Sequence, residues 1–177
     1  MPSISMSNAG IVYSDSQTVT GQTGASVTAQ VLDHYEEGTW TPTLSATSGS
    51  FSNITFSNST PKGWYTRTGR VVNSHFAFKL SAFSVGTGSG TIVIGGFPFK
   101  FTSDYGSWQQ PATSGMKVAY LTNTASGNLY PSDSIIFYFV GNSTNAYGRW
   151  GNSDGNVAPS ELTASTGIAG SAIYITD

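Results

Sequence analysis

The chain has 177 residues, of which 9% are charged and none is cysteine, and its formal net charge is −2. Ordinary soluble domains are roughly 25% charged, so Ser, Thr, Asn and Gly must supply most of the polar surface. The lack of cysteine excludes disulfides and thiolate chemistry, and the lack of a basic excess argues against nucleic-acid binding. No apolar run approaches the roughly 20 residues of a membrane-spanning helix, so we expect no membrane insertion.

Residues 1–31 form a polar segment in which Tyr13 is the single aromatic residue. A weak alternation of apolar residues, Ile4 and Met6 followed by Ile11 and Tyr13, cannot bury enough surface for independent folding. We predict an extended N-terminal arm that docks to other proteins of an assembly or adds a strand to a neighbour's sheet. A flexible tail is the alternative.

The segment LDHYEEGTWTPTL, residues 32–44, separates this arm from the rest of the chain. It contains three of the nine acidic residues, Asp33, Glu36 and Glu37, and the next five charged residues along the chain are all basic: Lys62, Arg67, Arg70, Lys79 and Lys100. This separation of charge predicts that Glu36 and Glu37 pair with Arg67 or Arg70, within one subunit or between neighbours. Chance segregation of sparse charges is the alternative.

From residue 39 onward, alternating apolar segments between turn residues predict short antiparallel strands. They lie at Thr39–Leu44, around Phe51–Phe56, and at Arg70–Leu80, Thr91–Ile94, Phe97–Phe101, Met116–Thr122, Ser134–Val140 and Ala172–Thr176. Arg70–Leu80 has one apolar and one wetter face, whereas Ser134–Val140 is apolar on both faces, as under a second layer or in a subunit interface. Residues 32–177 are therefore predicted to form an all-β domain, an antiparallel β-sandwich of jelly-roll type.

Several aromatic residues lie in or beside predicted turns and loops: Trp64, Tyr105, Trp108, Tyr147 and Trp150. The last two belong to a predicted long loop at residues 142–156. Exposed aromatic rings stack on sugars or anchor protein contacts. Trp108, Tyr147 and Trp150 are therefore candidates for contact with a glycan or a protein receptor. Packing beneath the loops and contact between subunits are the alternatives.

No residue pattern points to catalysis or to a bound cofactor. His34 and His75 are the only histidines. The one GxSxG sequence, GNSDG at residues 151–155, lies in the predicted loop 142–156, so no nucleophile elbow between a strand and a helix is expected. The carboxylates that glycoside hydrolysis would need are scattered, at Asp104, Asp133, Asp154 and Glu161. Asp33, Glu36 and Glu37 supply only half of a calcium site, and the loop Asn152, Asp154 and Asn156 is interpreted as an Asx-rich turn. We expect no catalytic, cofactor or metal site.

The segment LDHYEEGTWTPTL resembles the (L)D-x-YEEGTWTP-x-L segment of structural proteins of tailed bacteriophages, often tail-fibre or other virion surface proteins. Further stretches are similar in order. Residues 10–13 resemble the family's upstream segment, and residues 63–72 resemble its G-x-Y-T-x-x-G-x-x-V strand. Residues 90–99 resemble its G-x-I-x-I-x-G-L-P-F stretch, with Phe97 in place of Leu. Residues 172–176 resemble its terminal strand. The resemblance implies a virion β-sandwich, commonly a homotrimer, without catalytic residues.

These observations predict a non-enzymatic virion surface protein, a short tail fibre or adhesin, released with the particle by host lysis. Its expected partners are its own copies, other virion proteins bound through the arm, and a host glycan or protein. Its expected assembly residues are Tyr35, Glu36, Glu37, Trp40, Arg67 and Arg70. A trimeric capsid decoration protein, favoured by the short chain, and a polysaccharide depolymerase are the alternatives.

Overall fold

The computed structural model describes residues 35–57, 61–103, 135–150 and 155–177, together with the strands β1 (Ile4–Ser7), β2 (Gly10–Tyr13), β3 (Val31–Leu32) and β10 (Met116–Thr122) as backbone elements. Every regular element in this part is a strand, except the single 3-10 turn η2 (Pro159–Glu161). The prediction of an all-β protein is confirmed. Among the described residues, no helix is long and apolar enough to cross a membrane.

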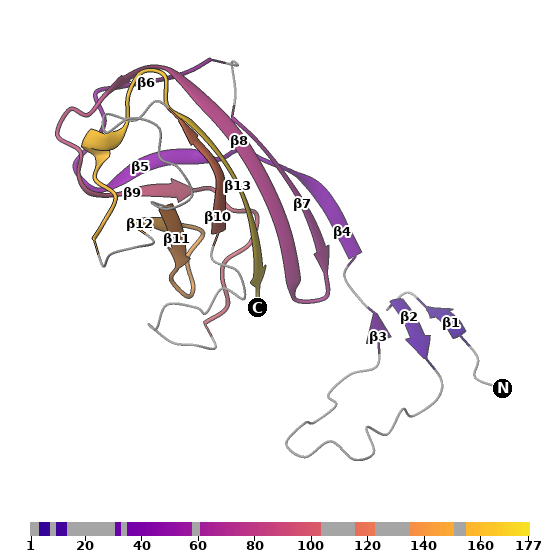
Figure 1. Ribbon diagram of the computed structural model, residues 1–177. Coiled ribbons are helices and arrows are strands. Elements are labelled where there is room, and N and C mark those ends of the chain that lie inside the picture. Colours follow the sequence, from indigo (N-terminus) through magenta and orange to yellow (C-terminus); the bar gives the residue numbers. More distant parts are fainter. Residues whose placement is uncertain are drawn as a thin grey trace.

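The described strands of the main domain form one large antiparallel sheet (Figure 1). Its order is β4-β7-β8-β13-β10-β11-β12-β9-β5, and β6 pairs with β8. A separate sheet contains β1, β2 and β3. The remaining bounds are β4 (Tyr35–Trp40), β5 (Thr43–Ser48), β6 (Asn53–Phe56), β7 (Lys62–Thr68), β8 (Val71–Ser84), β9 (Ser89–Gly95), β11 (Ile135–Phe139), β12 (Ala146–Trp150) and β13 (Gly167–Ile175).

The two ends of this strand order, β4 and β5, are consecutive in the chain and are separated only by Thr41 and Pro42. Proline has no N–H group for a sheet ladder, so the ladder of β4 ends here and the chain crosses to β9. The expected strand Thr39–Leu44 is therefore two strands. The sheet folds over into two facing layers, which gives a sandwich-like architecture (Figure 1).

Strand β8 is the longest element and organises one layer. Its first part pairs with β7 on one side and with β13 on the other, while its last residues pair with β6. Its residues alternate between buried and exposed, with Val72, Phe76, Phe78 and Leu80 inside. This confirms the predicted division into an apolar and a wetter face.

The core is built around aromatic rings between the layers. Phe101 stacks on Phe139 with ring centroids 4.1 Å apart and meets Tyr174 edge-on at 4.7 Å. Trp40 stacks on Phe97 at 4.7 Å. The segment from Phe97 to Phe101 was expected to be a strand, but its backbone bonds instead to the turn after β11, including Phe101 N to the carbonyl of Ser143 at 2.9 Å.

The second layer differs from the sequence-based expectations in two places. In β11, alternate residues Ile135, Phe137 and Phe139 are buried, but Ile136 is 40% exposed, so within one chain this strand has one buried face, and burial of the other face in a subunit interface stays a prediction. The predicted loop 142–156 contains the strand β12. Because a Cβ at Gly148 would meet the side chain of Ile92 at 2.7 Å, this small residue lets the strand lie close to its neighbour, while it interrupts the apolar alternation that reveals a strand.

Candidate interaction face

Strands β4, β7, β8 and β13 turn one side toward the core and the other outward; we call the second side the outer face. Successive side chains of a strand point to opposite sides, so the register defines rows of outward residues across these strands. The first row contains Thr39, Trp64, His75 and Ser171; the second contains Glu37, Thr66, Asn73 and Ile173; and the third contains Tyr35, Thr68, Val71 and Ile175.

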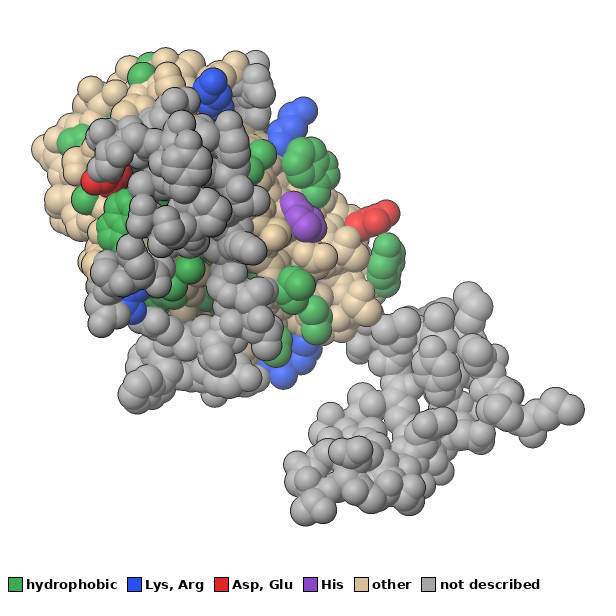
Figure 2. Space-filling view, in the orientation of Figure 1, with side chains coloured by type: hydrophobic (Ala, Val, Ile, Leu, Met, Phe, Trp, Pro, Cys, Tyr) green, Lys and Arg blue, Asp and Glu red, His purple; other side chains and the backbone are tan. Residues whose placement is uncertain are grey.

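The outer face carries most of the exposed large hydrophobic residues that the structure describes. Of the six large hydrophobic residues exposed in the described part of the chain, five lie on it, with exposed fractions between 36% and 67%: Tyr35, Trp64, Val71, Ile173 and Ile175. Figure 2 shows hydrophobic side chains gathered near the histidine and one acidic side chain on the same side of the molecule. Exposed hydrophobic residues gathered on one face of a sheet make that face a candidate interaction site.

Apart from Tyr35, which lies on β4 with Thr68 between it and Val71, the exposed apolar residues of the outer face fall into two groups. Val71 and Ile175 are directly paired across β8 and β13, and Ile173 lies two residues from Ile175 on the same edge of the face. We call these three the aliphatic cluster. Trp64 stands apart on β7, with Thr66, Asn73 and His75 between it and Ile173. The face thus offers two chemically different surfaces.

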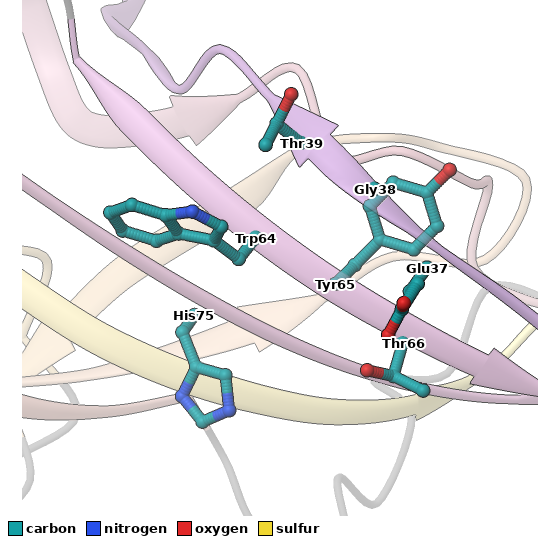
Figure 3. A pocket seen from close by; sticks show the side chains of 7 residues that line it. All are labelled: Glu37, Gly38, Thr39, Trp64, Tyr65, Thr66 and His75. Carbon is teal, nitrogen blue, oxygen red and sulfur yellow. The ribbon is translucent and has the colours of Figure 1, made fainter.

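Trp64 separates two shallow depressions. One has a volume of about 340 Å³ and is lined by Glu37, Gly38, Thr39, Trp64, Tyr65, Thr66 and His75 (Figure 3). The other, of about 320 Å³, is lined by Phe56, Pro61, Lys62, Trp64, Ala77, Phe78 and Lys79. The indole of Trp64 therefore borders a depression on each side. One depression is lined by Glu37 and polar groups, and the other contains Lys62 and Lys79.

The adjacent carboxylates of β4 bond to tyrosines. The hydroxyl of Tyr65 donates to Glu36, and the hydroxyl of Tyr35 donates to Glu37 at 3.2 Å. The hydrogen bond to Glu36 raises the pKa of Tyr65, and the negative charge of Glu37 raises the pKa of Tyr35. Glu36 and Glu37 thus point to opposite sides of β4, and only Glu37 belongs to the outer face.

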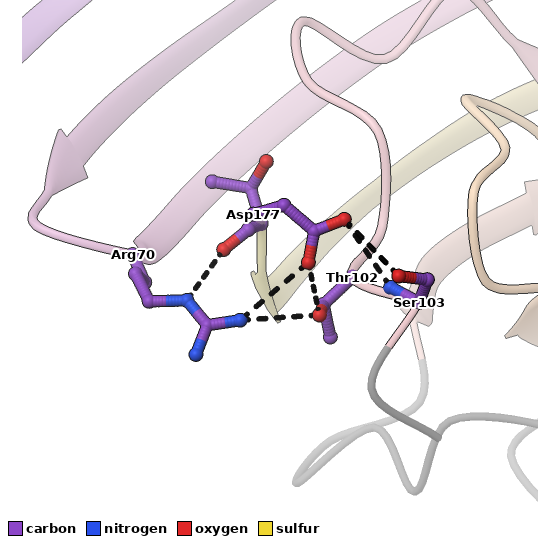
Figure 4. Close-up of polar contacts among 5 residues, drawn as sticks. Arg70, Thr102, Ser103 and Asp177 are labelled. Atoms are coloured by element: carbon purple, nitrogen blue, oxygen red, sulfur yellow. Dashed lines mark hydrogen bonds and ion pairs between the residues drawn. The ribbon is translucent and has the colours of Figure 1, made fainter. Parts of the chain in front are cut away.

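The predicted arginine partners are engaged elsewhere. Arg67 donates from Nε to the carbonyl of Gly69 at 2.8 Å and lies 4.7 Å above the ring of Phe99. Arg70 holds the end of the chain, through the carbonyl of Thr176 at 2.9 Å and an ion pair with Asp177 at 3.5 Å (Figure 4). Within the described ranges, no ion pair joins Glu36 or Glu37 to either arginine. Pairing between subunits stays a prediction.

Trp40 was expected at an assembly interface, but it is only 8% exposed and belongs to the core. The reason is strand alternation: Tyr35 and Glu37 point outward, so Trp40 points inward. Its indole lies over Gly63, the residue paired with it on β7, where a Cβ would collide with the ring. Trp40 is therefore a structural anchor of the motif.

The candidate receptor aromatics are not displayed at described loop tips. Tyr147 lies in β12 and stacks on Tyr138 with centroids 5.4 Å apart. Trp150, at the end of the same strand, is half-buried against the core. Trp108 lies outside the described residues, as do the other candidates Asp33, His34, Asp104, Tyr105, Asp133, Asn152 and Asp154.

The remaining candidates bring no catalytic or metal site together in the described chain. His75 is exposed on the outer face, as its strand position predicted, and Glu161 is half-buried in η2. No group of three or more His, Cys, Asp or Glu residues in the searched part could hold a metal ion. The outer face is thus the main candidate site.

The position of Trp64 within a strand was not predicted from the sequence. Trp64 was expected beside a turn, because the segment KGWYTRT lacks a clear apolar alternation.

Comparison with known proteins returned no similarity on which to draw. No protein-family model matches the chain, and no curated protein or solved structure matches it significantly. Inference about function therefore rests on the residues and their arrangement.

Proposed function

We propose that this chain is a non-enzymatic bacteriophage virion structural protein, a short tail-fibre or adhesin-type surface protein. In this proposal the domain is a jelly-roll β-sandwich that assembles as a homotrimer, and residues 1–31 dock it to other virion proteins. The observation that carries the proposal is the position of the YEEGTWTP segment, which forms β4 and the crossing to β5 and contributes Tyr35 and Glu37 to the outer face.

The arrangement of this segment supports a structural rather than a catalytic role. Trp40 stabilises the domain because it packs in the core, while the exposed Glu36 accepts a hydrogen bond from the hydroxyl of Tyr65 on the neighbouring strand. Outward residues extend an apolar surface that suits contact with other molecules. A chain with 9% charged residues and such a surface fits a component of an assembly.

A trimeric capsid decoration protein is the second candidate, and one observation favours it. Tyr147 and Trp150 belong to a strand and are half-buried, which weakens the argument that loop tips contact a receptor. In this reading the outer face packs against the shell or against neighbouring subunits.

A polysaccharide depolymerase is the alternative from another class. It would have to release reducing sugar from the host envelope, and mutation of paired carboxylates would have to abolish that activity.

The experiment that tests the proposal is cryo-electron microscopy of intact particles from a lysate that contains this protein. Density for the domain at the tail or baseplate supports the fibre or adhesin, and density at three-fold positions of the shell supports decoration. Mass spectrometry of gradient-purified particles, with the particle-free fraction as control, gives an independent reading. Absence of the protein from the particle overturns both proposals.

A further inference from the structure

We propose that Trp64 is the stacking platform of a saccharide-binding site on the outer face. The site extends across the indole, from the depression at Glu37 and His75 to the depression at Lys62 and Lys79. Its ligand is an oligosaccharide with an acidic sugar on the lysine side. This inference rests on the proposed function for the biological source of the sugar, since an adhesin meets glycans on a host surface.

The position of Trp64 is the first argument. Its side chain is 50% exposed in the middle of β7, where an aromatic residue would normally be turned into the core. Thr39 and His75 lie directly opposite it on the neighbouring strands, where Cβ atoms are about 5 Å apart. An apolar ring surrounded by polar groups matches a pyranose ring, which has a C–H face and a rim of hydroxyls.

The hydrogen-bonding capacity around the indole is the second argument. Glu37 accepts one hydrogen bond, from Tyr35, and a carboxylate has further acceptor positions. In the described part of the chain, the side chains of Thr66 and His75 make no hydrogen bond of their own. Figure 3 shows these groups around the same depression as Trp64. Together they provide both donors and acceptors for sugar hydroxyls.

Size and charge define the ligand further. A depression of about 340 Å³ lies at the lower end of the range of ligand sites, as suits one or two sugar rings. The second depression continues the surface beyond Trp64 and adds Lys62 and Lys79, both exposed. Two ammonium groups beside an aromatic platform favour a carboxylate or other anionic group on the adjoining sugar.

Another protein copy fits this part of the face less well. A protein contact gains most from contiguous apolar surface that becomes fully desolvated, and the aliphatic cluster on β8 and β13 provides that surface. Around Trp64, burial beneath a protein would desolvate Glu37, His75 and Lys62 without assured partners, at a free-energy cost. A saccharide satisfies these groups through its hydroxyls.

The test uses the full chain and a glycan array that carries neutral and acidic bacterial surface oligosaccharides, followed by calorimetric titration of the strongest hit. We expect binding of an acidic oligosaccharide that Trp64→Ala weakens by about tenfold or more and Trp64→Phe weakens less. Lys62→Gln with Lys79→Gln is expected to weaken acidic oligosaccharides selectively. Ile136→Ala, which removes an exposed hydrophobic side chain of β11 outside the outer face, is the matched control and should bind like the wild type.

Circular dichroism melting of each variant establishes that it is folded, and Trp64→Phe keeps the test decisive if Trp64→Ala does not fold. Absence of wild-type binding to every oligosaccharide, or equal binding by all folded Trp64 variants, overturns the inference. A changed sedimentation coefficient for the variants without a change in saccharide binding would assign Trp64 to a subunit contact and also overturn it. Particle location tests the proposed function separately, so a virion protein that binds no saccharide contradicts this inference alone.

Discussion

At the residue scale, two glycines of the first layer each face an aromatic ring across the strand pair β4–β7. Gly38 is paired with Tyr65, and Gly63 is paired with Trp40. A Cβ at Gly38 would lie 2.9 Å from the phenol ring, and one at Gly63 would collide with the indole. The glycines of EEGTW and KGWY are therefore required for close approach of the rings and not for turns.

We expect Gly63→Ala to destabilise the domain by about 1–3 kcal/mol, because the added methyl group overpacks a buried site. Urea unfolding gives the free energy, with the exposed Thr68→Ala on the same strand as control. The smaller ring of Trp40→Phe should relieve part of the collision, so the double variant should lose less than the sum of the single changes. Strict additivity would contradict the contact.

A second residue-scale prediction concerns alkaline stability. Burial, the largest influence, raises the pKa of Tyr174 well above its ordinary value of 10.0, and a contact with the backbone of Phe99 opposes it only in part. Above pH about 10 the phenol ionises in the unfolded chain but stays protonated in the folded one, so stability falls as the pH rises.

We therefore expect Tyr174→Phe to differ from the wild type by less than about 1 kcal/mol at pH 7 and to gain relative stability progressively above pH 10. Urea unfolding at pH 8, 9.5 and 10.5 measures the difference. Tyr147→Phe serves as the control for general alkaline effects. A difference that is independent of pH across this range would contradict the assigned burial of the phenol.

At the element scale, the C-terminal end of β13 is held by the residues that begin β8. The backbone of Arg70 accepts from Thr176 N at 2.9 Å, and its guanidinium donates to the carbonyl of Thr176 and to the hydroxyl of Thr102 at 3.1 Å. Asp177 adds an ion pair whose two side chains are about half exposed. Hydrogen bonds to the backbone, more than the exposed ion pair, should therefore stabilise this end.

The resulting prediction separates these two contributions. Asp177→Asn, whose amide oxygen can still accept the hydrogen bond from the hydroxyl of Thr102, should cost less than about 0.5 kcal/mol, as an exposed pair does. Arg70→Ala should cost about 1–2 kcal/mol through the lost hydrogen bonds of the guanidinium to the carbonyl of Thr176 and the hydroxyl of Thr102. Urea unfolding measures both, and hydrogen exchange should show faster exchange of the last amides of β13 in Arg70→Ala. Equal effects of the two substitutions would show that the ion pair is the dominant contribution.

At the scale of the whole molecule, the arm and the main domain are built from separate sheets. Strands β1, β2 and β3 pair only with one another, and β4 begins the large sheet. Deletion of residues 1–31 should leave a folded domain, with a melting temperature within a few degrees of the full chain, and should abolish incorporation into particles. Circular dichroism and immunoblots of purified particles test the two parts. Normal incorporation of the truncated protein would remove the docking role.

The aliphatic cluster of Val71, Ile173 and Ile175 bears on the proposed homotrimer. If copies of the chain associate through this part of the outer face, a lysine at its centre should oppose association, because a buried unpaired charge is costly. We expect Ile173→Lys to shift the protein toward the monomer in sedimentation velocity, while Ser48→Lys on the exposed part of β5 leaves it unchanged. If Ile173→Lys does not shift the protein toward the monomer, the aliphatic cluster is not the contact between subunits, and β11, where Ile136 is also exposed, becomes the expected contact.

The sequence by itself determined the all-β class and the two faces of β8, because alternation with period two reports directly which side of a strand is buried. It also predicted a strand at Thr39–Leu44, where the structure has the last two residues of β4 and the first two of β5, divided at Pro42. Strand β12 was missed, since small residues at Ala146 and Gly148 replace the usual apolar signal.

Only the tertiary structure decided what each aromatic and charged residue does. Trp40 on β4 and Trp64 on β7 lie in paired strands, yet Trp40 is buried in the core and Trp64 is exposed on the outer face. Arg70 bonds to residues at the far end of the chain rather than to the nearby glutamates. Such roles depend on pairing between distant strands, which fixes the direction and neighbours of a side chain and leaves no periodic signal in the local sequence.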